Sequence, residues 1–312
     1  MDKPGIIVIT GPTATGKTAL GALLARDIGG EVVSADSMQV YTHMDIGTAK
    51  PSAGDMLGVP HHLIGFVPPW EDYSVARYIA DAQRCIGDIL GRGKRPLLVG
   101  GTGLYIDSLL SGRSFSARGD AALRRKLEGE YDEAGGEAML SKLGEFDRES
   151  ADKLYPNDKK RIVRALEAYM SSGKALSQHD RETRALPPRY ESLRFALTFS
   201  DRAELYARIG RRVDSMVAGG LVEEVRGLLE MGVPPEATAM QAIGYKEIAA
   251  AIRGDLGMGD AVEKIKMESR RYAKRQLSWR RRDAGARWIA WEGEPDIAGA
   301  AGTIEMAISD KK

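Results

Sequence analysis

The feature that most constrains this chain is a glycine-rich loop near its N-terminus. The segment GPTATGKT, residues 11–18, matches the pattern G-x-x-x-x-G-K-[ST] in full, and the apolar, β-branched run GIIVIT comes directly before it. A segment with helical spacing follows the loop. A strand, a glycine-rich turn and a helix in this order place backbone amides and the positive end of the helix around a concavity, which favours the binding of a polyphosphate.

The loop is predicted to hold a diphosphate or a nucleotide through its backbone and two of its side chains. Lys17 neutralises terminal phosphate oxygens, and the Thr18 hydroxyl is a ligand for Mg²⁺, the cofactor that we expect. The predicted binding residues are Gly11, Pro12, Thr13, Ala14, Thr15, Gly16, Lys17 and Thr18. Many proteins with such a loop hydrolyse a nucleoside triphosphate or transfer one of its phosphoryl groups. Which phosphate compound is bound must therefore be inferred from the rest of the sequence.

The composition is that of a globular protein. The chain has 312 residues, 43% of them hydrophobic, which is enough for a substantial core. Its 45 Lys and Arg residues nearly balance its 44 Asp and Glu residues, so net charge alone favours neither a nucleic acid nor a membrane as partner. The single cysteine excludes an internal disulfide, and no long apolar segment marks the N-terminal region. We therefore expect a cytoplasmic monomer with no membrane-spanning segment.

Strand-like and helix-like segments alternate along the chain, which predicts an α/β fold with a doubly wound parallel sheet around the P-loop. Strand-like runs occupy residues 5–10, 31–35, 95–101 and 187–200. The segment beyond Gly112 is charged and almost free of strand signal, which predicts a helical insertion domain at residues 115–189. Residues 1–114 and 190–312 then form the core, with helices to about Arg282 and a tail after Trp291 of loop and surface.

The absence of two motifs argues against the hydrolysis of a nucleotide. A nucleotide hydrolase with this loop usually carries an Asp at the end of a later apolar strand to help hold the metal, whereas the run RPLLVGG ends in glycines. A GTPase would also carry an N-K-x-D motif that reads the base, and the sequence has none. Nucleotide hydrolysis is therefore not the expected reaction.

Eight segments spread over nearly the whole chain carry a more specific signal. They are GPTATGKT, ADSMQVYTHMDIGTAKP, VPHHLIG, YSVARY, VGGTGLYIDSLLSG, NDKKRIVRALE, AIGYKEI and AKRQLSWRR. In this order they resemble the bacterial tRNA dimethylallyltransferases, also called tRNA isopentenyltransferases. Several of the segments are long and low in degeneracy, so the resemblance is specific.

The resemblance implies a doubly wound P-loop domain that carries a helical insertion domain, and it implies a reaction. A dimethylallyl group moves from dimethylallyl diphosphate to the exocyclic amine of the adenosine immediately 3′ of the anticodon in tRNA. The expected partners are therefore this donor and the tRNA anticodon stem-loop. The P-loop would hold the diphosphate of the donor, and no phosphoryl group would be transferred.

Three residues are the candidates for catalysis. An adenine amine is a poor nucleophile, so a base must take its proton as the new bond forms. Asp36 follows the strand-like run at residues 31–35, where α/β sheets bind ligands, although an Asp there is often only a helix cap or turn former. The resemblance places the Thr102 hydroxyl on the bridging oxygen of the diphosphate, and it places Arg226 on the diphosphate as well.

A basic segment near the C-terminus predicts contacts with RNA phosphates. Residues 270–287 contain eight basic residues and a single acidic one. Arg271, Arg275 and Arg282 can share one helix face, and aromatic residues are interleaved with them. A solvated helix face or a lid that contacts an anion is the alternative interpretation.

The resemblance adds further residues to the predicted RNA site. The segment after the second strand would line a pocket for an unstacked adenosine, and two later segments would grip the anticodon loop. The full set is Asp36, Ser37, Met38, Gln39, Thr102, Arg124, Lys160, Arg161, Ile162, Val163, Arg164, Gln241, Ala242, Ile243, Gly244, Tyr245, Lys246, Arg271, Arg275 and Arg282.

The adjacent histidines His61 and His62 could suggest a metal site. Neighbouring positions on a strand face opposite sides, and no other ligand cluster is visible, so structural roles are predicted. Gly65 stands where the family commonly carries an Asp, which leaves no acidic side chain at that point.

Two other functions share these features. A P-loop small-molecule kinase would have the same loop and a similar basic segment, and labelled ATP would reveal its product. A non-enzymatic RNA-binding protein could carry a P-loop that is structural or regulatory. RNA binding without a covalent product would support that alternative.

Overall fold

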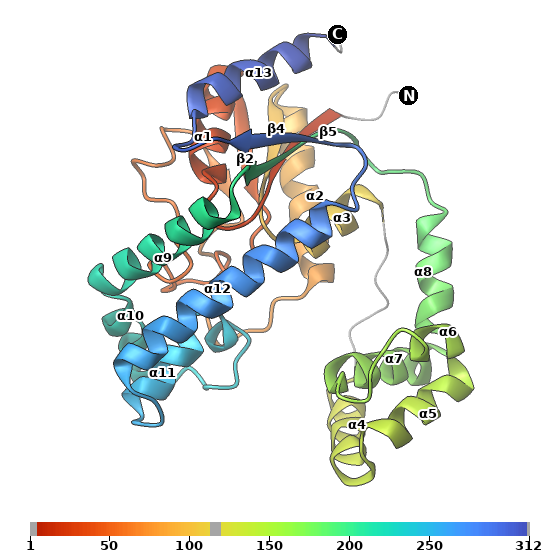
Figure 1. Ribbon diagram of the computed structural model, residues 1–312. Helices are drawn as coiled ribbons and strands as arrows, with labels where there is room; N and C mark the ends of the chain where they lie inside the picture. The colour runs from red at the N-terminus through yellow and green to blue at the C-terminus, as the bar shows by residue number, and fades with distance from the viewer. Residues whose placement is uncertain (1–4, 113–119, 311–312) are drawn as a thin grey trace. The chain divides into compact units, whose positions relative to one another are not determined.

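A computed structural model of the chain describes residues 5–112 and 120–310, which divide into two compact units (Figure 1). The first unit comprises the described parts of Met1–Leu110 and Tyr190–Lys312, and the second comprises those of Ser111–Arg189. The predicted insertion at residues 115–189 lies within the bounds of the second unit. Its predicted start, between residues 114 and 115, lies outside the described residues.

The first unit is built on a parallel sheet with the strand order β3-β2-β4-β1-β5-β6. All neighbouring pairs among these six described strands run parallel, which confirms the predicted α/β class. The carboxyl ends of the strands therefore meet at one edge of the sheet, where the loops that follow them lie together. The strands are β1 (Gly5–Thr10), β2 (Gly30–Ser34), β3 (His61–His62), β4 (Arg95–Gly100), β5 (Glu191–Phe199) and β6 (Ala286–Trp291).

Helices cover both faces of this sheet (Figure 1). On one face lie α1 (Lys17–Asp27) and α13 (Ile297–Ser309), and on the other lie α2 (Val75–Gly91) and α3 (Gly103–Leu110). A further group of helices connects β5 to β6: α9 (Arg202–Ala218), α10 (Leu221–Glu230), the 3₁₀ turn Ala239–Gln241, α11 (Tyr245–Ile252) and α12 (Met258–Arg280). None of the described helices has the length and apolar character that a membrane crossing requires.

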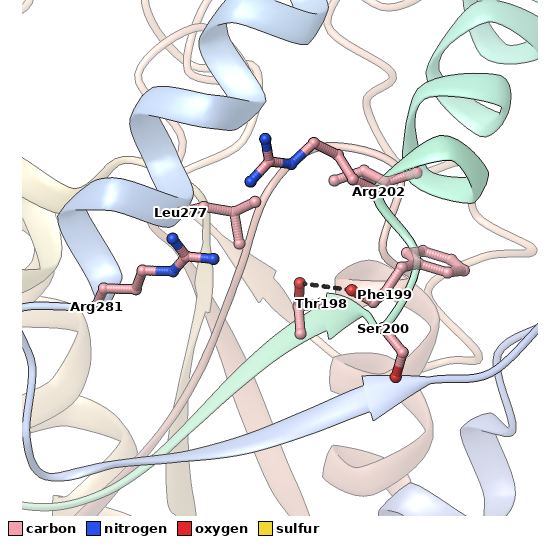
Figure 2. A pocket seen from close by; sticks show the side chains of 7 residues that line it. Thr198, Phe199, Ser200, Arg202, Leu277 and Arg281 are labelled. Carbon is pink, nitrogen blue, oxygen red and sulfur yellow. Dashed lines mark hydrogen bonds between the residues drawn. The ribbon is translucent and has the colours of Figure 1, made fainter.

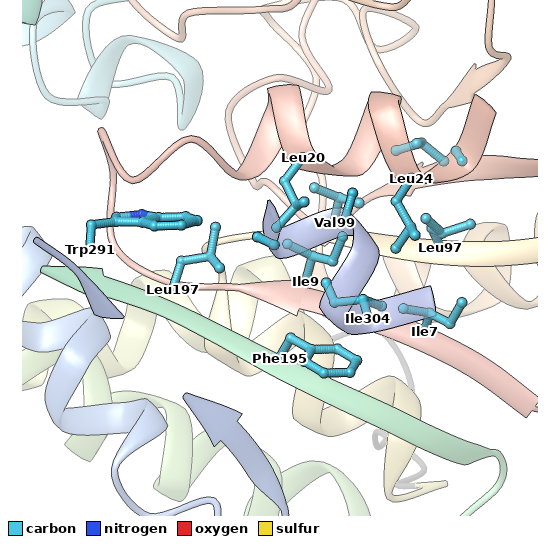
Figure 3. Packing of buried hydrophobic residues seen from close by; sticks show 14 of the residues in the cluster. Ile7, Ile9, Leu20, Leu24, Leu97, Val99, Phe195, Leu197, Trp291 and Ile304 are labelled. Atoms are coloured by element: carbon cyan, nitrogen blue, oxygen red, sulfur yellow. The ribbon is translucent and has the colours of Figure 1, made fainter. Parts of the chain in front are cut away.

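The main core lies between the sheet and the α1–α13 layer (Figure 3). Leu20 of α1 and Ile304 of α13 pack there with Ile7 and Ile9, because alternate residues of β1 share one face of the sheet. Val8 is also fully buried, on the opposite face. Burial of both faces explains why β1 is a continuous apolar run without polar alternation.

The C-terminal part of the chain differs from the prediction. The sequence predicts loop and surface after Trp291, but this tail forms α13, whose Ala300 and Ile304 are buried in the core. Glycines at positions 299 and 302 and several alanines weaken its helical pattern, because glycine disfavours a helix and small side chains give little amphipathic contrast. The sequence patterns also miss β6, which completes the sheet beside β5.

The second unit contains only helices as regular structure among its described residues, in keeping with the strand-poor sequence. The helices are α4 (Ala121–Ala134), α5 (Gly136–Phe146), α6 (Arg148–Ala151), α7 (Lys159–Ser172) and α8 (Leu176–Arg184). Their buried side chains form a separate core that includes Leu127, Met139, Leu143 and Leu166. A core of its own allows this unit to keep its structure independently of the sheet.

Candidate functional site

The phosphate loop, residues 11–18, joins β1 to α1 and is held by internal contacts. Gly11 has φ 146°, and a Cβ there would lie 2.5 Å from the Leu197 carbonyl oxygen, so only glycine fits. The Pro12 carbonyl accepts from the Thr15 hydroxyl at 2.9 Å and from the Lys17 ammonium at 2.6 Å. These bonds shape the loop before any ligand binds.

Lys17 lies among charged groups at the carboxyl edge of the sheet. The pKa of Lys17 is lowered to about 7, mainly by burial and also by the nearby Arg212, while the Asp36 carboxylate opposes both effects. Burial also lowers the pKa of Arg212, again opposed by Asp36. Two desolvated cations thus stand near a single carboxylate, and an added anion would relieve their mutual repulsion.

Asp36 stands in the loop after β2 with one of its oxygens engaged. Its Oδ1 accepts hydrogen bonds from the backbone N–H groups of Met38 at 2.9 Å and Gln39 at 3.3 Å. These bonds are those of a turn former, which is the alternative interpretation of this residue. Its Oδ2 accepts no hydrogen bond from the described residues, which leaves that oxygen available to a ligand.

Thr102 is fixed beside the Asp36 loop by short backbone contacts. Its Oγ1 accepts from the Ser37 N–H at 3.1 Å, and its own N–H donates to the Ala35 carbonyl at 3.0 Å. A Cβ on Gly100 would lie 2.3 Å from that same carbonyl, so glycine is required for the close approach of the two strand ends. The structure therefore brings the predicted residues Asp36, Ser37 and Thr102 together.

The basic segment has an inner face that contacts these loops. Arg280 is one of the eight basic residues of this segment, but it is only 3% exposed and donates to Asp107 at 2.6 Å. Its charge is therefore paired with the Asp107 carboxylate and is not available on the surface. The pKa of Tyr272 is raised to about 12, mainly by burial and to a smaller extent by the nearby Asp36 carboxylate. This hydroxyl therefore stays protonated.

The outer face of the same segment carries the predicted RNA contacts. Arg271 and Arg275 are exposed on α12, and Arg282 is exposed just beyond its end. Arg271 pairs with Glu268 at 2.6 Å, and the guanidinium of Arg275 lies 5.6 Å from the centre of the Tyr272 ring. Surface ion pairs of this kind are weak, so these arginines remain available to an RNA phosphate.

The AIGYK segment divides into buried and exposed residues. Tyr245 is buried, and its hydroxyl donates to Glu224 at 2.5 Å, while Ala242 and Gly244 are buried near it. Glu224 in turn accepts from the backbone N–H groups of residues 45–47 at 2.7 to 3.0 Å. Glu224 and Tyr245 therefore fix the backbone of residues 45–47, which follow the Asp36 loop in the sequence. The exposed members of the segment are Gln241 and Lys246, and Ile243 is partly buried.

The predicted RNA residues of the helical unit also divide in this way. Ile162 and Val163 lie in its core, where their side chains support α7 from within. Lys160 and Arg161 are exposed on the first turn of that helix. Two further members, Arg124 and Arg164, donate to the fully buried carboxylate of Glu167 at 2.8 to 3.2 Å.

Arg226, the third predicted catalytic residue, is exposed on α10, and none of the described interactions joins it to the phosphate loop. Arg212 of α9 is the arginine near Lys17 and Asp36. The sequence gives little means of choosing it, because Arg208, Arg211 and Arg212 lie within one helical stretch. The structure shows that Arg212 lies near Lys17 and Asp36, and that Arg208 Nε donates to the Ala14 carbonyl of the phosphate loop at 3.4 Å.

A hollow of about 310 Å³ opens at the carboxyl end of β5 (Figure 2). Figure 2 shows Arg202 and Arg281 reaching toward it from the start of α9 and the end of α12, on either side of Leu277. The remaining lining residues are Thr198, Phe199, Ser200 and Leu205. None of the predicted site residues lines this hollow.

The paired histidines have separate protein partners. His62 Nε2 lies 2.8 Å from the buried Glu31 carboxylate, and His61 Nδ1 lies 2.9 Å from the Val59 carbonyl oxygen. Glu31 also accepts from Arg92 and Lys94, and the Arg92 guanidinium holds the pKa of that carboxyl well below its usual range. Both histidines therefore take part in structural contacts.

Comparisons with family models match most of the chain. A model described as IPP transferase matches residues 39–283, and one described as isopentenyl transferase matches residues 4–63. A tRNA dimethylallyltransferase of Desulforudis audaxviator is 50% identical over 99% of both chains. One of Acetivibrio thermocellus is 47% identical over 91% of both chains.

Solved structures give the same result. A tRNA isopentenylpyrophosphate transferase of Staphylococcus epidermidis is similar with a TM-score of 0.73 and 38% identity, over 99% of this chain and 100% of that one. A eukaryotic dimethylallyltransferase, in a study of its action on tRNA, is similar with a TM-score of 0.83 and 30% identity. That likeness covers 98% of this chain and 79% of the other.

Proposed function

This chain belongs to the tRNA dimethylallyltransferase family, and we propose that it transfers a dimethylallyl group to the adenosine immediately 3′ of the anticodon in tRNA. The donor is dimethylallyl diphosphate and the acceptor is the exocyclic amine of the base. The observation that carries the proposal is the meeting of three strand-end groups: the phosphate loop with Lys17, the carboxylate of Asp36 and the hydroxyl of Thr102.

The phosphate loop and two cations bind the diphosphate of the donor. Loop amides and the amino end of α1 provide hydrogen-bond donors to the phosphate oxygens. Lys17 and Arg212 add charge, and because both are desolvated, they interact with an anion more strongly than exposed cations would. Arg212 takes the diphosphate-binding role that the resemblance gave to Arg226.

The transfer forms one bond and breaks another. The amine nitrogen of adenine bonds to the first carbon of the dimethylallyl group, and the bond from that carbon to the bridging oxygen breaks. Asp36 Oδ2 takes the proton of the amine, while the Oδ1 hydrogen bonds to the loop hold the carboxylate in place. The departing oxygen keeps the electron pair, and the Thr102 hydroxyl and the cations stabilise its charge.

The hydroxyl of Thr18 beside the phosphate loop fits a magnesium ion that would bind together with the diphosphate. Thr18 is a partly exposed hydroxyl in the first turn of α1, directly after Lys17. No group of three or more His, Cys, Asp or Glu side chains in the described part of the chain could hold a metal. Mg²⁺ suits such a site, because it commonly takes one or two protein oxygens together with phosphate oxygens and water. We assign Thr18 as its protein ligand, and the ion would neutralise phosphate charge.

The tRNA is proposed to contact both units. In the first unit the exposed arginines of the α12 segment bind phosphates of the anticodon stem-loop, and Ser37, Met38 and Gln39 line the adenosine pocket. In the second unit Lys160 and Arg161 add phosphate contacts. The enzyme is proposed to act in the cytoplasm, where its tRNA substrate is found. It is also proposed to act as a monomer. Light scattering of the purified chain measures the mass of the active species.

The decisive experiment is analysis of the modified nucleoside. Unmodified tRNA is incubated with the protein, Mg²⁺ and dimethylallyl diphosphate, then digested, and its nucleosides are analysed by mass spectrometry. The expected result is an adenosine that carries one dimethylallyl group and maps to the position 3′ of the anticodon. An unmodified tRNA would contradict the proposal, and a phosphorylated product from a parallel reaction with labelled ATP would indicate a kinase.

A further inference from the structure

Gln276 lies on the inner face of α12, between two loops of the site. Its side chain is buried, with 8% of the residue exposed. The exposed arginines Arg271 and Arg275 lie on the same helix and face outward. A buried amide among the basic residues near the end of this helix must satisfy its hydrogen-bonding groups inside the protein, since leaving them unpaired is costly.

The amide of Gln276 bridges the phosphate loop and the loop after β4. Its Oε1 accepts from the backbone N–H of Thr13 at 3.1 Å, and its Nε2 donates to the carbonyl of Gly101 at 3.0 Å. The orientation of the amide follows from its partners, because a backbone N–H can only donate and a carbonyl can only accept.

The two partners belong to different functions in the proposed reaction. Thr13 is part of the loop that binds the diphosphate, and Gly101 directly precedes Thr102, the donor to the leaving oxygen. Glycine at position 101 is needed for the bridge, since a Cβ there would lie 2.2 Å from Gln276 Nε2. One side chain therefore sets the spacing between the group that holds the donor and the group that helps it leave.

We propose that Gln276 is a positioning residue that fixes the phosphate loop and the Thr102 loop in a single geometry for transfer. This inference rests on the proposed prenyl transfer and deepens it. Gln276 acts through Thr13 and Gly101 and does not react itself. Its removal leaves a loop N–H and a carbonyl unpaired, so both donor binding and the rate of transfer fall, while tRNA binding by the outer face of α12 is retained.

The first test separates the two hydrogen bonds from the volume of the side chain. Gln276→Met keeps the size but neither bond, and we expect kcat/KM for the donor to fall roughly tenfold to a hundredfold, with kcat and KM both affected. Affinity for tRNA should stay within about twofold, which also shows that the variant is folded. A wild-type kcat and KM in Gln276→Met would overturn the inference.

The second test uses protonation. In Gln276→Glu, a protonated carboxyl can still accept from Thr13 and donate to Gly101, whereas an ionised one loses the donor. The charged groups of the site are Lys17 and Arg212, which favour ionisation, and Asp36 and the bound diphosphate, which oppose it; the protonated hydroxyl of Tyr272 lies beside it. Burial and the diphosphate should raise the pKa of the introduced carboxyl.

We measure kcat/KM of the variant and of the wild type at pH values from about 8.5 to about 6, and divide the first by the second. The ratio cancels effects of pH that are common to both proteins. We expect the ratio to rise as the pH falls, by at most about tenfold per unit. A ratio that does not change with pH would contradict the role of the bond to Gly101. Gln83→Glu on α2 is the matched control, because the Gln83 side chain makes no hydrogen bond to the described residues and lies outside the site.

The third test is a double-mutant cycle. Gly101→Ala should be harmful with Gln276 present, because the new methyl group displaces the amide, and should cost much less in Gln276→Ala, where the space is open. Equal reductions in both backgrounds would overturn the inference. Each series includes wild type with the same tRNA and donor, so inactive wild type refutes the proposed function, whereas active wild type with unaffected variants refutes only the role of Gln276.

Discussion

The α/β unit and the helical unit hold their proposed functional groups in different ways. In the first unit, the Asp36 carboxylate accepts from backbone N–H groups of its own loop, and the Thr102 hydroxyl accepts from the backbone of the neighbouring strand end, so their positions are set by hydrogen bonds. In the second unit, Lys160 and Arg161 are exposed on the surface of α7, and the hydrophobic face of that helix is buried in the core of the unit. Chemistry needs groups held to fractions of an ångström, whereas attraction of a polyanion works over several ångströms.

This difference predicts two kinds of mutational effect. Changes at the strand ends should alter the rate of transfer and leave tRNA affinity nearly unchanged. Changes at the exposed cations should alter affinity and its dependence on salt, with little effect on the rate at saturating tRNA. A residue that moved both quantities strongly would break the comparison.

The largest effect is expected at Asp36. Asp36→Asn keeps the shape of the side chain but removes its basicity, and we expect the single-turnover rate of prenylation to fall by about two to four orders of magnitude. Rapid quench with labelled donor and excess enzyme measures this rate, and tRNA affinity should change by less than about threefold. Asp27→Asn, at an exposed position on α1, is the matched control. A fully active Asp36→Asn enzyme would mean that Asp36 only shapes the adenosine pocket.

Thr102 is expected to follow. Thr102→Ala removes the hydroxyl that stabilises the departing oxygen, and the single-turnover rate should fall by about two to three orders of magnitude. Thr102→Ser restores a hydroxyl on the same backbone and should recover most of the rate. If serine and alanine were equally impaired, the methyl group and its packing would be the cause, and the proposed role in leaving-group stabilisation would be wrong.

Lys17 makes donor binding depend on pH. Its pKa is about 7 in the free protein, and a bound diphosphate favours the protonated form, so the pKa rises on binding. Above pH 7 the free protein must then take up a proton to bind the donor, and the dissociation constant should increase by up to about tenfold per pH unit until the pKa of the complex is reached. Below that range the charged form predominates in both states and the dependence disappears.

Calorimetry with dimethylallyl diphosphate in the absence of tRNA measures this linkage. Between about pH 7.5 and about pH 9.5 the terminal phosphate of the donor is already ionised, so the titration belongs to the protein. Lys17→Ala should bind the donor more weakly and lose this pH dependence. The same slope in the variant would assign the proton to another group.

The sequence predicts the strand ends well because their signals are local. A β-branched run before a glycine-rich loop specifies β1 and the loop after it, and an Asp after the next strand of the sequence marks the end of β2, which β4 separates from β1 in the sheet. Arg212 and Gln276 have no local signal, because their roles depend on which face of α9 and α12 packs toward the loops. The same limit applies to Arg280, which sequence alone cannot distinguish from its exposed basic neighbours.

The C-terminal helix shows another limit of sequence patterns. The residues of α13 include five glycines and alanines in a row at positions 298–302, and such a segment has little contrast between its faces. Its helical state comes from tertiary packing, since Ile304 and Ile308 cover the sheet beside α1. In contrast, the helices of the second unit were predictable as a class, because the segment is long, charged and poor in β-branched runs.

Among the surface cations, the arginines of the α12 segment should have the larger effect. Arg271→Gln, Arg275→Gln and Arg282→Gln combined should reduce the slope of log affinity against log salt by about 0.7 for each phosphate that is no longer neutralised, or about two units in total. Filter binding or fluorescence anisotropy at several salt concentrations gives the slope. The rate at saturating tRNA should remain close to wild type. An unchanged slope would support the alternative of a solvated helix face.

The smallest effect is expected in the helical unit, where Lys160→Gln and Arg161→Gln remove two exposed charges from the first turn of α7. If each contacts one phosphate, the slope should fall by about 1.4 units and the single-turnover rate should not change. Arg148→Gln with Lys153→Gln is the matched control, since these cations belong to the same unit and pair closely with Asp152 and Glu149, at 3.0 and 2.7 Å, whereas the Arg161 guanidinium lies 3.8 Å from Asp158. Equal slopes for the two double variants would show that α7 contributes only general positive charge. A slower transfer step in the α7 variant would instead show that this unit also positions the adenosine, and the division between a rate-setting unit and an affinity-setting unit would no longer hold.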